Sequence, residues 1–229
     1  FRNTLIIDKY DPQIVQWGTR RFRHDGSESM EDAMIWNVFR SLRQINPQLW
    51  VKQLFMKAFE KDFPYRVEDL EIHLWKRVPP PRDLSKPELD FEIDIIIESE
   101  QFVWFMLAKY KSDIRMNKGQ NNSIIRNIDV GLHYTKQRDF YFSLLFLDTF
   151  YSPYGQILIN QYRESEKFIL QELPHRTTEI SYLNGVSILT WKNVYHLLKG
   201  IYLYNKSSFE RFISSQACDW LYPKISDGG

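Results

Sequence analysis

The sequence predicts an α/β protein in which a mixed β-sheet lies between layers of helices. Segments 91–98 and 102–110 alternate apolar and polar side chains with period two, and they are rich in β-branched and aromatic residues, as strands are. Residues 28–45 repeat apolar side chains at helical spacing. The remainder of the chain alternates strand-like with helix-like segments, which is the order expected of a sheet covered by helices on both faces.

Composition predicts one large domain without a strong overall charge. The 229 residues are 43% hydrophobic, which is enough to bury a full core. Thirty basic and 29 acidic residues leave a net charge of +1, so a nucleic-acid site would have to be a local basic patch. The single cysteine, Cys218, excludes an internal disulfide and a thiolate zinc cluster, and it fits a cytoplasmic, reducing location. No apolar run approaches the roughly 20 residues of a membrane helix, so we expect no membrane partner.

The N-terminal region, residues 1–76, is predicted to be mainly helical with an early strand. Serines and acidic residues precede and open the first helix, where they satisfy free amides and suit the helix dipole. In chain order we expect a short strand and a loop over 1–24, helices over 28–45 and 48–60, and a strand over 68–76.

A proline-rich loop at 77–88 separates this region from the α/β core at 89–229, within one domain. Pro79, Pro80 and Pro81 lack backbone donors, so this segment should be extended. The core should contain two strands joined by a turn at 99–101, a mostly polar helix over 117–137 that ends near Gly131 or a little later, a buried strand over 139–148, a helix over 162–173, and a strand followed by a helix capped by Thr190.

Charged side chains on the two central strands predict a site for chemistry. Asp94 shares a strand face with Glu92, and Lys109 follows on the neighbouring strand. Carboxylates beside an ammonium are what a magnesium-dependent phosphodiester hydrolase needs, because hard oxygens hold the ion and the lysine orients water or stabilises charge on the phosphate. The alternative is a set of solvated charges on a hairpin, which spacing alone does not exclude.

The turn sets which residues of the two strands face each other. A turn centred on 99–100 predicts Glu92 opposite Leu107 and Asp94 opposite Phe105. The acids then face Lys109 across the hairpin.

The order of these elements resembles the PD-(D/E)XK, or restriction-endonuclease-like, nuclease superfamily over residues 25–200. The resemblance is carried by a helix with an early glutamate, "EIDIII", a turn, a strand ending in "AKYKSDI", and a helix with "IIRNIDVG". It implies a three-layer restriction-endonuclease-like fold and Mg²⁺-dependent cleavage of DNA. Asp94 matches the metal-binding aspartate and Lys109 the catalytic lysine, while Glu31 or Glu28 matches the additional helix glutamate.

The sequence departs from this family at Leu107, which stands where the acid of the E-x-K motif is expected. An apolar side chain cannot bind Mg²⁺, so metal binding should weaken. Three explanations stay open: Glu92 has taken over as a metal ligand, the site has lost activity, or the acid has been replaced by substitution in this chain. We favour loss of activity, because a migrated ligand requires a second coincidence.

Further polar residues are candidates for contact with nucleic acid or for solvated surface: Arg126, Lys111, Gln120 and Asn122. The first functional hypothesis is a DNA endonuclease, with a homodimer left open. The second is a non-catalytic relative that binds nucleic acid or a protein through the same cleft. The third is a structural α/β domain that binds neither metal nor DNA.

Overall fold

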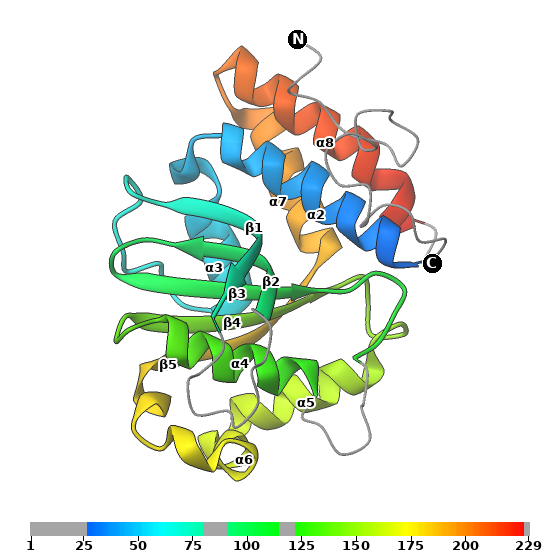
Figure 1. Ribbon diagram of the computed structural model, residues 1–229. Coiled ribbons are helices and arrows are strands. Elements are labelled where there is room, and N and C mark those ends of the chain that lie inside the picture. The colour runs from blue at the N-terminus through cyan, green and yellow to red at the C-terminus, as the bar shows by residue number, and fades with distance from the viewer. Residues whose placement is uncertain (1–26, 80–90, 115–121, 227–229) are drawn as a thin grey trace.

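A computed structural model describes residues 27–79, 91–114 and 122–226, and its centre is a five-stranded mixed sheet (Figure 1). The strands lie side by side in chain order. The first three are antiparallel neighbours, whereas the third, fourth and fifth run parallel. They are β1 (Glu71–Val78), β2 (Phe91–Glu98), β3 (Phe102–Ala108), β4 (Asp139–Phe146) and β5 (Leu183–Thr190).

Helices form a layer on each face of the sheet (Figure 1). One face is covered by α2 (Ser27–Gln44), α3 (Val51–Phe59), α7 (Trp191–Tyr204) and α8 (Ser208–Ser226). The other is covered by α4 (Ser123–Tyr134), α5 (Pro153–Glu164) and α6 (Glu166–Glu172), and short 3₁₀ turns lie at Pro47–Leu49, Pro174–Arg176 and Glu179–Tyr182. The predicted three-layer α/β architecture is confirmed. None of the described helices has the length and apolar character needed to cross a bilayer.

Two hydrophobic cores lie on the two faces of the central strands. Every residue of β3 is buried, and alternate side chains enter different cores. Trp104 packs beneath the α2 layer, whereas Phe105 packs beneath α4. This double burial explains why β3 and β4 are almost continuously apolar.

Two helices and one strand predicted before the proline-rich loop are present. The helix over 28–45 is α2, and the helix over 48–60 is a 3₁₀ turn followed by α3. The strand predicted at 68–76 lies at Glu71–Val78 and pairs with β2, so this region belongs to the same sheet as the core. The strand and loop expected within 1–24 lie outside the described residues, as does most of the loop at 77–88.

Two predictions about the later helices need correction. The single helix predicted over 162–173 is wrong, because Ser165 is extended and separates α5 from α6. The Ser165 hydroxyl accepts a hydrogen bond from Lys167 N at the start of α6. The sequence interpretation also missed most of α5 and all of α8. The hydrophobic pattern of α8 is weak. The helix predicted over 117–137 begins at Ser123 in the described residues and ends at Tyr134, a little after Gly131 as predicted, whereas residues 117–121 lie outside the described part of the chain.

One residue of β1 has an unusual backbone conformation. Trp75 has φ of 51°, in the left-handed region that bulky side chains rarely adopt. The residues on either side of Trp75 pair with those on either side of Asp94, so Trp75 lies across from Asp94 on β2. Such strain costs on the order of 1–3 kcal/mol, and the surrounding packing must hold it in place.

Candidate functional site

An acid from α2 meets the lysine that follows β3. The Lys109 ammonium lies 3.1 Å from Glu31 Oε1. The other carboxylate oxygen of Glu31 accepts a hydrogen bond from Tyr110 N at 3.0 Å and lies 3.4 Å from the Ser112 hydroxyl. Glu31 therefore binds both the ammonium and the backbone of the segment that carries it.

Asp94 joins this group from β2. Its Oδ2 accepts a hydrogen bond from Ala108 N at 2.9 Å, at the last residue of β3. Asp94 and Glu31 therefore accept hydrogen bonds from backbone N–H groups two residues apart, and the charge of Asp94 raises the pKa of Glu31. Helix α2 and strands β2 and β3 thus bring together three of the residues that the sequence singled out: Glu31, Asp94 and Lys109.

The predicted strand register is wrong by two residues. Ile95 pairs with Met106 and Glu98 with Val103. The cause is a turn one residue further along the chain than expected, closed by Ser99 N donating to Phe102 O.

Continuing the observed register toward the start of β2 places Asp94, rather than Glu92, across from Leu107. Opposed residues of antiparallel strands share a face. This extension makes Leu107 the neighbour of Asp94 on β3, although the Leu107 side chain itself packs in the core beneath α4.

Burial dominates the electrostatics of the site. Glu31 is 9% exposed, and loss of hydration is the main reason that its pKa is raised to about 7. The charge of Asp94 raises this pKa further, whereas Lys109 and the Tyr110 N–H lower it. Two acids therefore share a poorly hydrated space with one ammonium, and a cation placed there would stabilise the ionised form of both.

The residues fit a divalent cation only in part. Leu107 is 8% exposed and packs in the core beneath α4 and α5, so it adds no ligand. Glu92 lies 3.8 Å from the Arg77 guanidinium, in a loose ion pair at the start of β2. In the ranges that the structure describes, no three His, Cys, Asp or Glu side chains form a group suited to a metal. Two carboxylates, those of Asp94 and Glu31, are what this site offers to a cation.

The residues proposed to contact nucleic acid have different surroundings. Asn122 is buried and caps α4, because its Oδ1 accepts from Ile125 N at 2.9 Å and its Nδ2 donates to the Tyr162 hydroxyl at 3.1 Å. This structural role leaves Asn122 unsuited to a ligand contact. Exposed Arg126 lies over the Phe91 ring at 4.8 Å, on the face of the sheet opposite α2. Gln120 lies outside the described residues.

Lys111 is exposed two residues beyond Lys109. Its φ is 49°, and its ammonium lies over the rings of Tyr110 and Tyr151, 5.6 and 5.9 Å from their centroids. Contact between Lys111 and nucleic acid stays a prediction.

The sequence interpretation missed the residues that hold the Lys109 segment from its other side. Trp191 Nε1 donates to Lys109 O at 3.0 Å, and Lys109 N donates to Leu145 O at 2.7 Å. Asp113 accepts hydrogen bonds from Tyr154 N and Gly155 N, in the first turn of α5, which keeps its pKa below the usual value. Recognising "SPYG" as a helix start would have revealed a partner for Asp113.

Comparisons with protein-family models, curated proteins and solved structures find no match for this chain, so the site must be interpreted from its own geometry.

Proposed function

We propose that this protein is a divalent-cation-dependent phosphodiester hydrolase acting on DNA, of the PD-(D/E)XK type, with a weakened cation site. The observation that carries the proposal is the meeting of Glu31, Asp94 and Lys109 from three separate elements. The order of α2, the antiparallel strands β2 and β3, and α4 supports it as well, because the resemblance was based on these elements.

Each side chain has a role suited to its position. Asp94 and Glu31 would hold Mg²⁺ through hard carboxylate oxygens, and bound Mg²⁺ would neutralise phosphate charge and polarise a water molecule. Lys109 would orient the attacking water or offset charge on the phosphate. Its ion pair with Glu31 and the hydrogen bond from Trp191 to its carbonyl oxygen hold this lysine in one place.

Leu107 explains why we propose a weakened site. In the family that the sequence resembles, a third carboxylate stands at this position, and here Leu107 packs in the core instead. Without this carboxylate, cation affinity should be low and cleavage slow. Glu92 pairs with Arg77 on β1 instead, and its carboxylate lies 3.8 Å from the Arg77 guanidinium.

A second candidate function is DNA binding without cleavage. Two observations favour it: Leu107 occupies the acid position, and Lys109 is already paired with Glu31. In this alternative the Glu31–Lys109 pair is structural, and DNA binding depends on neither Mg²⁺ nor Asp94.

Nicking of supercoiled plasmid, measured with Mg²⁺ or Mn²⁺ and with EDTA, tests the two candidates. Hydrolysis predicts cation-dependent nicking that Asp94→Asn abolishes, whereas the matched change Glu92→Gln leaves it intact. DNA binding that survives in EDTA and in Asp94→Asn, without nicking by the wild type, supports the second candidate. Light scattering in the same buffers tests whether a homodimer, which could cut both strands, forms.

A further inference from the structure

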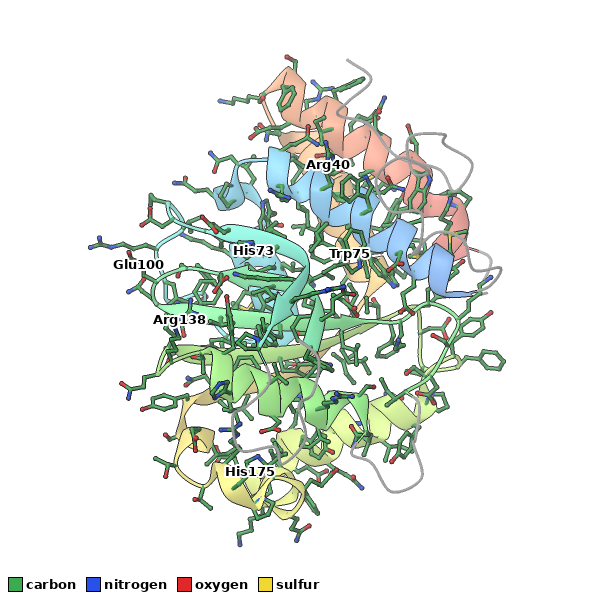
Figure 2. All side chains as sticks on the ribbon, viewed as in Figure 1. Arg40, His73, Trp75, Glu100, Arg138 and His175 are labelled. Atoms are coloured by element: carbon green, nitrogen blue, oxygen red, sulfur yellow. The ribbon has the colours of Figure 1, made fainter. Side chains whose placement is uncertain are left out.

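Two tryptophans and an arginine form a stacked column on the half-buried side of α2 that faces β1. The rings of Trp36 and Trp75 are stacked, with centroids 5.9 Å apart and planes 12° from parallel. The Arg40 guanidinium lies over Trp36, 4.6 Å from its centroid. In Figure 2, Arg40 on α2 is seen above Trp75 on β1.

The column adjoins the candidate site through both of its elements. Trp75 lies across from Asp94, and its Nε1 donates to Asp32 Oδ1 at 3.2 Å. Asp32 directly follows Glu31 on α2. A ligand stacked on the column would therefore be next to the proposed cleavage site.

Packing against a hydrophobic core accounts for Trp75 but not for Trp36. Among the described residues, Trp36 is not one of those packed against either hydrophobic core. Its Nε1 is buried and has no hydrogen-bond partner, a condition that native proteins seldom leave without a reason. The φ of Trp75 adds a second unusual feature, and backbone strain of this kind concentrates where ligands bind.

The chemistry of the column suits a nucleobase. Aromatic rings stack bases of any sequence, because every base has a π-face. Positive charge is also present: burial and the nearby charge of Arg43 both lower the pKa of Arg40, so two guanidinium groups lie close together on α2. Guanidinium groups bind phosphate and exchange with bases on aromatic faces.

We propose that Trp36, Trp75 and Arg40 form a stacking site for an unpaired base of a nucleic-acid strand whose phosphate reaches Asp94, Glu31 and Lys109. The choice of nucleic acid rests on the proposed function, and the inference adds that the strand is single or locally opened. A base takes the place of the guanidinium on Trp36, and Arg40 turns toward the neighbouring phosphate. Duplex DNA, whose bases stay stacked on one another, cannot use this site without opening.

Binding of fluorescein-labelled dT12, rU12 and a 12-base-pair duplex, measured by anisotropy in EDTA, tests the proposal without requiring cleavage. The wild type should bind a single strand more tightly than the duplex, and Trp36→Leu should weaken this binding by at least about fivefold, as expected for loss of one base stack. Trp36→Phe should restore part of it. The dT12 and rU12 arms distinguish a DNA strand from an RNA strand.

Trp220→Leu is the matched control. Trp220 also carries a cation on its ring, with Lys224 Nζ 3.9 Å from the centroid, and also has a buried N–H without a partner, but it lies on α8. Equal loss of binding in Trp220→Leu and Trp36→Leu overturns the proposal, as does wild-type affinity in a folded Trp36→Leu. If binding depends on Trp36 but plasmid is not nicked, hydrolysis is refuted and the stacking site stands. If plasmid is nicked but binding does not depend on Trp36, the stacking site is refuted and hydrolysis stands.

Discussion

The Lys109 ammonium lies 3.1 Å from a carboxylate oxygen of Glu31, although the two residues are 78 positions apart in the chain. The same carboxylate accepts the N–H of Tyr110, so it fixes the start of the loop after β3 as well as the lysine. A pair held in this way at a buried acid should govern both the pH dependence of stability and the response to cations.

Glu31→Gln should remove a pH dependence of folding. The pKa of Glu31 is about 7 in the folded protein against 4.5 for an ordinary glutamate, so between these values the folded chain binds more protons than the unfolded chain. Wild-type stability should therefore fall as pH rises from 4.5 to 7, by on the order of 3 kcal/mol from this group. Urea unfolding at a series of pH values should show a flatter profile for Glu31→Gln.

Absolute stability is less informative here, because the substitution also leaves Lys109 without its carboxylate partner. Exposed Glu164 provides a control, and Glu164→Gln should keep the wild-type slope. An unchanged slope in Glu31→Gln would show that Glu31 titrates normally.

Asp94→Asn should lower the pKa of Glu31. The amide oxygen of the new side chain can still accept a hydrogen bond from Ala108 N, so the free energy of unfolding should change by less than about 1 kcal/mol. Removal of the Asp94 charge takes away one of the two causes that raise the Glu31 pKa. In the same unfolding series, the pH at which stability stops falling should move below 7. An unchanged pH would mean that the two carboxyl groups do not interact.

Leu107→Glu should destabilise the protein without divalent cations and make its stability depend on them. Burial of a carboxylate at this 8% exposed position should cost on the order of 2–3 kcal/mol. If the new acid faces Asp94, as the register indicates, Mg²⁺ should bind and restore stability. Thermal melts with and without Mg²⁺ measure this effect, and plasmid nicking should increase in parallel.

Leu107→Gln is the control for the Leu107→Glu experiment, because glutamine has the shape of glutamate without its charge. An equal response of both variants to Mg²⁺ would contradict a cation site between residues 94 and 107.

Gly131→Ala should destabilise the protein. A Cβ at Gly131 would lie 2.0 Å from Phe140 Cζ, inside a core where the ring has no room to move freely. Overpacking of this kind costs about 1–3 kcal/mol, which exceeds the gain of up to about 1 kcal/mol in helix propensity. Gly200→Ala on α7 is the control, since nothing lies within 4 Å of its Cβ, and there the propensity gain should raise the melting temperature.

The sequence by itself determined the elements whose pattern is local. Period-two alternation located β2 and β3, helical spacing located α2, and Thr190 was recognisable as the cap of α7, where it forms a capping box with Asn193. Backbone periodicity and capping depend on residues a few positions apart, so they can be read directly from the chain. The candidates Asp94, Lys109 and Glu31 followed from these patterns and from a family resemblance.

Only the tertiary structure decided how those residues meet. The register depended on a turn one residue away from the expected position, and it pairs Ile96 rather than Asp94 with Phe105. The sequence marked Asn122 as a ligand contact, but the tertiary structure makes it a buried helix cap. The raised pKa of Glu31 likewise arises from burial beneath segments distant in the chain, because desolvation and long-range contacts belong to the packed molecule rather than to any local pattern.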